Sequence, residues 1–334
     1  MKRYDSLDGV RMLACFGIVI MHILANGKYI INPILNDIIM KFTDFVVLFM
    51  ILSAFSVCCG YYEKIKNNKI TMEEFYKKRI SKILPFFIML ILIDIVVEHN
   101  KISIIEGFAD ATMLFGFLPK SLSVIGVAWF LGVVFIFYLM FPFFTYLFSN
   151  KKRAWIVTVI SLIMNYLSFT YFEIDRANMF HSFSFFCIGG LIFLYKDNLI
   201  KLCNKNRIMS FCGVILSSIL YFLPLDNYIL YLFQILLFSC VLIIYAISFN
   251  KSLLNNKITH FFGGNISLEI YLSHMLIFRI IEKLKLLYLT ENNYISYIIT
   301  IVIVISGTVL FSKIYKNFIN YIATKKSNNN LHNT

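Results

Sequence analysis

An arginine and a histidine lie eleven residues apart near the start of the chain, in the stretch LDGVRMLACFGIVIMH. In a helix, eleven steps make three turns plus about 20°, so Arg11 and His22 would share a face. The rise between them is about 16 Å, roughly half the hydrocarbon thickness of a bilayer. A neutral imidazole at that depth can accept a proton from a substrate hydroxyl, which makes His22 a candidate general base. The alternatives are a structural histidine within a helix bundle and an arginine that reaches the lipid headgroups.

A second group of cations lies in the segment FYKKRISKILP. Arg79 and Lys82 are three residues apart, the spacing of one helix face, and Lys78 adds charge beside them. One arginine can bind two phosphate oxygens at once, and lysine adds a point charge, so an anionic ligand is expected here. The alternative is a basic flank of the kind that membrane helices carry on the cytoplasmic side. Pro85 is expected in the first turn of the following span, where its missing N–H costs little.

A third polar group interrupts the apolar stretch NISLEIYLSH. Ser267, Tyr271 and His274 follow the i, i+4, i+7 spacing of one helix face, whereas Glu269 lies off it. A carboxylate inside a membrane needs a cation or a proton, so Glu269 is expected to face another helix. Glu269 and His274 are candidate catalytic residues and Tyr271 is a candidate pocket residue. The alternative is polar bonding between helices.

The remaining candidates are less distinctive. Ser53 and Trp129 are candidate pocket residues, although a tryptophan such as Trp129 is also typical of a membrane interface. His181 and His260 have no evident partner in the sequence. No histidine or cysteine spacing fits a metal site, and no glycine-rich phosphate loop occurs, so no metal is expected.

The elements that position these residues must be membrane helices. The 334 residues are 59% hydrophobic and 15% charged, with a mean hydropathy of +0.77, whereas soluble domains carry about 25% charged residues. Too little polar surface remains to cover a soluble globule. The excess of 31 Lys+Arg over 18 Asp+Glu fits the cytoplasmic loops of a multi-pass protein, and no nucleic-acid partner is expected.

The apolar pattern predicts an all-α, polytopic transmembrane bundle of about ten spanning helices. The segment 102–118 is a weaker apolar stretch and is expected to be re-entrant or to lie at the interface. Most of the basic residues fall on one side if both termini are cytoplasmic. The prediction is one membrane domain over residues 1–320 and a short polar cytoplasmic tail over 321–334, of which 325–334 is expected to be disordered. The ten predicted spans are 10–30, 42–61, 83–97, 127–148, 154–172, 183–195, 208–224, 228–249, 264–281 and 295–315.

These segments resemble, in chain order, the motifs of the acyltransferase-3 family of integral-membrane O-acyltransferases, and the resemblance extends from residue 7 to about residue 315. Ala54 stands where glycine is usual, and Lys82 replaces a frequent arginine. The matching segments are LDGVR followed by His22, the stretch ending Ser53-Ala54-Phe55, Arg79-x-x-Lys82-x-x-Pro85, Ala128-Trp129-Phe130-Leu131 with Pro142, and Ser267 to His274.

The resemblance implies transfer of an acyl group, usually acetyl, from a cytoplasmic acyl-CoA such as acetyl-CoA to a hydroxyl of a cell-envelope glycan or glycolipid. The protein would then lie among the lipids of a bacterial plasma membrane. The anionic end of coenzyme A would rest on Arg79, Lys82 and Arg11, and the thioester would approach His22. In this interpretation Glu269, Tyr271 and His274 shape and polarise the pocket.

Two other classes of function remain open from the residues alone. Buried Glu269, His22 and His274 would also suit a proton relay in an exporter of polysaccharide or lipid-linked sugar. A sensory or scaffold module of an envelope-assembly complex is the third interpretation. The sequence leaves open whether the chain acts as a homo-oligomer or within such a complex.

Overall fold

The structure is a computed structural model that describes residues 3–98, 101–118, 126–250 and 252–331, with side chains as far as Tyr321. The chain is 83% helical, and the described residues contain no strand. The predicted all-α class is therefore confirmed.

Ten long helices correspond one to one with the ten predicted spans, because each apolar stretch is helical throughout most of its length. They are α1 (Ser6–Gly27), α3 (Phe45–Val57), α5 (Met72–Glu98), α7 (Trp129–Leu147), α8 (Lys151–Thr170), α9 (Met179–Lys205), α10 (Arg207–Phe222), α11 (Tyr228–Ser248), α13 (Ser267–Lys283) and α14 (Asn293–Leu331). The shorter elements are α2 (Pro33–Met40), η1 (Lys41–Asp44), η2 (Cys58–Tyr62), α4 (Glu63–Lys66), α6 (Lys101–Thr112), η3 (Phe115–Phe117), α12 (Lys257–Thr259) and η4 (His260–Asn265).

Eight of these segments are long and apolar enough to cross a bilayer, including the continuous stretch Pro33–Lys66 that contains α3. Helix α10, with 16 residues, is shorter than a full crossing requires, and α13, with 17 residues, is at the lower limit. Outward faces of the bundle are apolar: Ile156, Ile160 and Ile163 are exposed on α8, and Ile298 and Val302 are exposed on α14. Such faces are stable against lipid rather than water. The protein is a multi-pass membrane protein.

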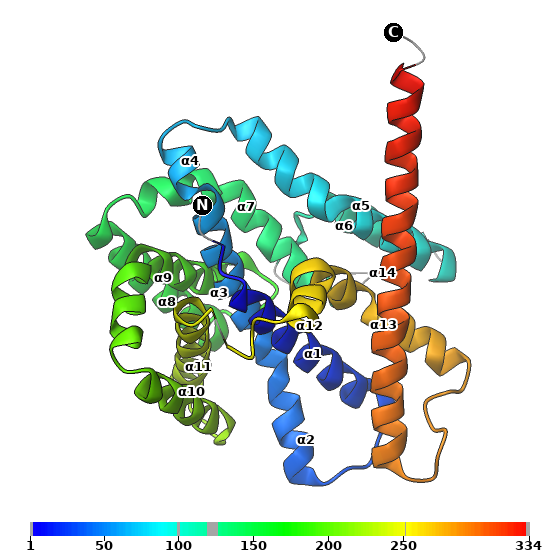
Figure 1. Cartoon of the computed structure of the whole chain (residues 1–334). Helices are drawn as coiled ribbons and strands as arrows, with labels where there is room; N and C mark the ends of the chain where they lie inside the picture. Colours follow the sequence, from blue (N-terminus) through cyan, green and yellow to red (C-terminus); the bar gives the residue numbers. More distant parts are fainter. Residues whose placement is uncertain (1–2, 99–100, 119–125, 251, 332–334) are drawn as a thin grey trace.

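The helix that carries Arg11 and His22 lies at the centre of the bundle. It packs against α2, α3, α11, α13 and α14, and at 67% buried it is the most buried of the candidate spans. Figure 1 shows α1 with α8 to α11 on one side and α13 and α14 on the other. A central helix surrounded by protein can hold ionisable groups at membrane depth, because its side chains face neighbouring helices instead of lipid.

The basic segment before Pro85 is part of the membrane helix α5 (Met72–Glu98) and not a loop that precedes this helix. Helix α5 starts at Met72, where the Thr71 hydroxyl accepts a hydrogen bond from the Glu74 N–H at 3.1 Å. Glu73 and Glu74 lie in the first turn of α5, where the positive end of the helix dipole stabilises their negative charge. The prediction that Pro85 lies in a first turn is therefore wrong, since it lies in the helix interior.

Two other segments clarify the predicted boundaries. Helix α6 packs against α5 and has 12 residues. It is too short to cross a bilayer, because a crossing requires about 20 residues. Helix α14 continues to Leu331 and so includes residues 325–331 of the segment 325–334 that the sequence predicts to be disordered. Residues 332–334 lie outside the described part of the chain.

Candidate active site

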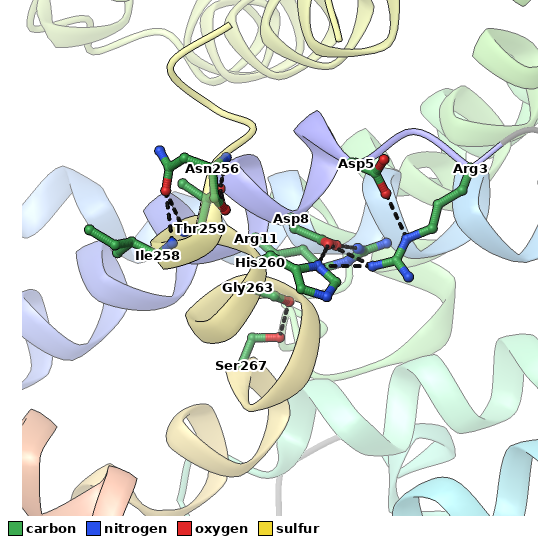
Figure 2. A network of polar contacts seen from close by, with 10 residues as sticks. All are labelled: Arg3, Asp5, Asp8, Arg11, Asn256, Ile258, Thr259, His260, Gly263 and Ser267. Atoms are coloured by element: carbon green, nitrogen blue, oxygen red, sulfur yellow. Dashed lines mark hydrogen bonds and ion pairs between the residues drawn. The ribbon is translucent and has the colours of Figure 1, made fainter. Parts of the chain in front are cut away.

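Asp8 is the centre of a network of charged side chains at the start of α1 (Figure 2). Its Oδ1 lies 2.6 Å from Nη1 of Arg11, and its Oδ2 lies 3.0 Å from Nη2 of Arg3. The same Oδ2 lies 2.8 Å from Nδ1 of His260 in η4. The Asp8 side chain is only 3% exposed. A buried carboxylate with three cationic or potentially cationic partners fixes the direction in which Arg11 points.

The network forms because η4 and α1 approach closely. A Cβ at Gly263 would lie 1.7 Å from the Asp8 carbonyl oxygen, and one at Gly9 would lie 2.4 Å from the Leu254 carbonyl oxygen. Neither position tolerates a side chain without movement of the backbone. The approach to η4 is fixed by Asn256, whose side chain accepts the N–H groups of Ile258 and Thr259 at the start of α12 (Figure 2). Two glycines and a helix cap thus bring His260 to Asp8.

A cavity of about 500 Å³ opens beside this network. Arg3, Arg11, Arg79 and Lys82 line it together with Asp8, so cations predominate at this end. Lys78 is exposed and does not line the cavity. The other lining residues come from α1, α3, α5, α7, η4 and α13 and include Ser53, Ser56, Tyr138, Ser267 and Tyr271.

Two arginines face the cavity from different helices. The Arg11 Nη2 donates to the Ser56 hydroxyl at 2.8 Å. The Arg79 guanidinium lies over the rings of Tyr61 and Tyr138, 4.4 Å and 5.4 Å from their centroids. Its Nε is buried and has no hydrogen-bond partner among the described residues. An unpaired buried donor beside a cavity is a position where an anionic ligand gains a charge-assisted hydrogen bond.

Three aromatic side chains in the lining of the cavity form a cluster. The rings of Phe49, Phe130 and Tyr271 contact one another, with centroids 5.4 to 6.0 Å apart. The Tyr271 hydroxyl donates to the Val127 carbonyl at 2.9 Å and is thereby held in place. We call Phe49, Phe130 and Tyr271 the aromatic wall.

His22 and His274 lie behind the aromatic wall. Their ring centroids are 5.3 Å apart, and the His274 ring is 6.1 Å from that of Tyr271. His274 is fully buried; its Nδ1 donates to the Tyr271 carbonyl at 2.7 Å, whereas Nε2 has no partner in the described structure. His22 is half-buried and does not line the cavity. A series of rings therefore leads from the cavity through Tyr271 and His274 to His22.

Glu269 faces away from the cavity, as the helical spacing predicts. Its Oε1 lies 3.1 Å from Nζ of Lys316 on α14, and the same Nζ donates to the Asn265 carbonyl. The carboxylate thus has the cationic partner that a buried acid requires. This ion pair joins α13 to α14 and places Glu269 away from His274 and Tyr271.

The structure separates Trp129 from the two other predicted pocket residues. Ser53 and Tyr271 line the first cavity, and the Ser53 hydroxyl lies 3.3 Å from that of Tyr138. Trp129 instead lines a second cavity of about 520 Å³, where the Arg176 guanidinium lies 5.2 Å from its ring centroid.

Several contacts of this region have no clear signal in the sequence. His260 and His181, for which the sequence shows no partner, bind Asp8 and the Tyr228 hydroxyl; both partners are distant in the chain. Ser56 and Tyr138 were also missed. Asp8 could have been found, because it precedes Arg11 by three residues, the spacing of neighbours on a helix.

The bundle and its cavity define a class: a multi-pass membrane protein with a cation-lined cavity that leads toward buried histidines. A family model described as an acyltransferase domain matches residues 4–314, and the chain belongs to this family, the acyltransferase-3 family. No curated protein and no solved structure matches the chain. The family membership makes the protein a membrane acyltransferase.

Proposed function

We propose that this protein transfers an acyl group, in the simplest case acetyl, from an acyl-CoA to a hydroxyl of a cell-envelope glycan or glycolipid in a bacterial plasma membrane. The cation-lined cavity is the observation that carries the proposal. It gathers three arginines and a lysine where the family's donor, with its phosphates, would need counter-charges. Acetyl-CoA or another acyl-CoA is the co-substrate.

The donor is accommodated as follows. Arg11, Arg79 and Lys82 bind the phosphates at the mouth of the cavity, which is cytoplasmic in the orientation that the basic loops favour. The volume of about 500 Å³ suits the slender pantetheine arm, with the nucleotide left at the mouth. The arm must span a distance comparable to the 16 Å rise, on the order of three helical turns, between Arg11 and His22.

The reaction is a transfer from sulfur to oxygen. His22 takes the proton of the acceptor hydroxyl, and that oxygen attacks the thioester carbonyl carbon. The carbon–sulfur bond breaks, and the proton passes from His22 to the coenzyme A sulfur. The products are an ester and free coenzyme A, and His22 returns to its starting state. His274 supports the His22 ring by packing against it.

The thioester reaches His22 only if the aromatic wall moves aside. A rotation of Phe49 or Phe130 would give the Tyr271 ring, which lies against His274, room to tilt about its hydrogen bond to Val127 and would lengthen the cavity toward His274. Binding of the acyl chain supplies the driving force for this rotation. Glu269 acts at a distance by fixing α13 against α14 through Lys316.

The test uses purified protein in detergent, with labelled acetyl-CoA and envelope glycan from cells that lack the protein. His22→Ala should lower transfer at least about 100-fold, the usual contribution of a general base. The matched control is His332→Ala in the polar tail, which should retain full activity. Transfer by His22→Ala at the wild-type rate would remove His22 from the proposed mechanism.

Donor binding is measured separately. Arg79→Ala should weaken acetyl-CoA binding about 10-fold or more, because charge-assisted hydrogen bonds to phosphate are lost. Arg207→Ala, an exposed arginine that also stacks on an aromatic ring, is the control and should leave the affinity unchanged. An unchanged affinity in Arg79→Ala would contradict donor binding in this cavity. Mass spectrometry of the modified glycan would identify the acyl group by its mass.

A further inference from the structure

The second cavity lies at the other end of α3 from the first. The first cavity contacts α3 from Phe49 to Val57, and the second contacts the segment from Thr43 to Met50. The rest of the second cavity comes from the starts of α7, α9 and α11, the end of α8 and the loop before α9. Phe169, Tyr228 and Trp129 contribute aromatic rings to its lining, and Asp44, Arg176 and His181 contribute polar groups.

Aromatic faces form much of this cavity. Phe169 and Tyr228 are stacked in parallel, with centroids 4.0 Å apart and planes 8° apart. Trp129 lies under the Arg176 guanidinium, which is exposed. The C–H bonds on one face of a pyranose ring pack well on such flat rings, while its hydroxyls remain at the edge for polar groups. Aromatic surface with a few convergent polar groups is the usual composition of a small-ligand site.

The polar side chains of the second cavity can form further hydrogen bonds with the hydroxyls of a ligand. Asp44 is 7% exposed; its Oδ1 accepts from the Tyr231 hydroxyl at 2.6 Å, and its Oδ2 lies 3.4 Å from the Tyr221 hydroxyl. A carboxylate has about four acceptor positions, so Asp44 can accept further hydrogen bonds. Arg176 donates through Nη1 to the Thr43 hydroxyl at 3.0 Å and has other N–H groups to offer.

His181 supplies a second, independent observation. Its side chain lines the cavity, and the residue is 7% exposed. The Tyr228 hydroxyl donates to the Asn165 side chain at 2.9 Å, so it accepts from Nε2 of His181 at 3.3 Å. The other ring nitrogen, Nδ1, is then an acceptor; it is buried and has no partner within the described ranges. A buried acceptor of this kind requires a donor such as a ligand hydroxyl.

The net negative charge of the side chains that line the second cavity disfavours anionic sugars. Three carboxylates, those of Asp44, Glu173 and Asp175, face one guanidinium, that of Arg176. Asp175 also accepts the Ala177 N–H at 2.8 Å, which fixes this part of the loop. An anionic sugar would meet a surplus of like charge, which disfavours binding.

We propose that this second cavity is the acceptor site, and that it binds a pyranose without negative charge, either neutral or amine-bearing. The ring packs on Trp129 and the other aromatic side chains that line the cavity, and its hydroxyls bind Asp44, Arg176 and His181. The assignment of this sugar as the acyl acceptor rests on the proposed function, but the binding of a pyranose in the second cavity does not depend on that function. The acceptor would approach the aromatic wall from the side opposite to the donor.

The chain contains two tryptophans, Trp129 and Trp155, which makes the binding directly observable. In the Trp155→Phe background, Trp129 is the sole tryptophan, and its fluorescence reports on the cavity. The purified protein in detergent is titrated with methyl glucoside, methyl glucosaminide and methyl glucuronide. We expect a saturable change with the first two and an affinity about ten-fold or more weaker for the glucuronide. Equal or tighter binding of the glucuronide, or no response to any of the three, would overturn the proposal.

Variants in the same background locate the binding. Arg176 is exposed, so the Arg176→Gln variant should fold normally. Asp44→Asn removes the charge of the buried carboxylate. Each substitution should weaken binding of methyl glucoside about ten-fold. Asp37→Asn, an exposed carboxylate on α2, is the control and should bind as the parent does. Unchanged affinity in both Arg176→Gln and Asp44→Asn would place the sugar elsewhere and overturn the proposal.

Acetyl-CoA binding to the same variants separates this proposal from the proposed function. Arg176→Gln should leave the acetyl-CoA affinity unchanged, whereas a loss of that affinity would show that the second cavity belongs to the donor and would overturn the assignment. If the parent protein binds methyl glucoside but not acetyl-CoA, the proposed function fails and the sugar site stands.

Discussion

Asp8 and His260 are 252 residues apart in the chain, and yet the Asp8 Oδ2 lies 2.8 Å from the His260 Nδ1. This contact joins the first helix to the π-helical turn that precedes α13. It places the carboxylate that holds Arg11 against the segment that leads to Tyr271 and His274. The charged end of the first cavity and the helix behind the aromatic wall are therefore one connected unit.

The first prediction concerns the stability of this unit. Asp8→Asn removes the charge shared by Arg3, Arg11 and His260 and should lower the free energy of unfolding by about 1–3 kcal/mol. Thermal unfolding in detergent can be followed with a thiol-reactive dye, because Cys15, Cys58 and Cys187 are buried in the folded protein.

Asp5→Asn is the matched control for this measurement. Asp5 also binds Arg3, but its side chain is 47% exposed, and the change should stay within about 0.5 kcal/mol. Equal losses in the two variants would contradict a central role for Asp8.

The second prediction tests whether Glu269 acts by chemistry or by position. Glu269→Gln leaves Lys316 without its ion-pair partner and should reduce both stability and transfer. In the exchanged variant, Glu269→Lys with Lys316→Glu, the ion pair can form again and part of the stability and activity should return. Stability and turnover are measured on the same preparations. A recovery of stability with no recovery of turnover would show that Glu269 is needed at its own position, as a catalytic residue would be.

The third prediction concerns the aromatic wall. Tyr271→Phe removes only the hydrogen bond to Val127 and should cost about 1 kcal/mol of stability with little change in transfer. Tyr271→Ala removes the ring that separates the cavity from His274. Water then reaches the thioester, and hydrolysis of acetyl-CoA without acceptor should rise relative to transfer. If Tyr271→Ala shows no such rise, the ring does not limit access to the buried histidines.

The fourth prediction concerns orientation in the membrane. With both termini in the cytoplasm, the loop after α4 faces inward and the loop before α9 faces outward. In intact cells, an impermeant maleimide should label Tyr171→Cys but label Asn67→Cys only after the membrane is opened. Cys212, which is exposed, is first replaced by serine. The reverse pattern would place the cation-lined cavity on the outside and would remove acyl-CoA as its ligand.

The helices and one face of the site could be predicted from the sequence. Long apolar runs require helices in lipid, and the ten predicted spans correspond to the ten long helices. The three-residue spacing of Arg79 and Lys82 places both on the first cavity, and Glu269 faces another helix as its position on α13 requires. These are local properties, since they depend only on helical geometry over a few turns.

The rest depends on which helices become neighbours, and no local pattern specifies that. The closeness of His22 to His274 and of Asp8 to His260 arises because α1 packs against α13 and η4. Trp129 illustrates the same point. It is adjacent to Phe130 in the chain, but the turn of the helix directs the two side chains to different cavities.

The aromatic wall also bears on the electrical integrity of the cell. The two cavities contact opposite ends of α3, and the aromatic wall lines the first cavity but not the second. A continuous aqueous path lined by arginines and histidines would conduct ions or protons and discharge the gradient across the membrane. In the proposed reaction, a barrier of three aromatic rings would let the two substrates meet from opposite compartments while the membrane stays insulated.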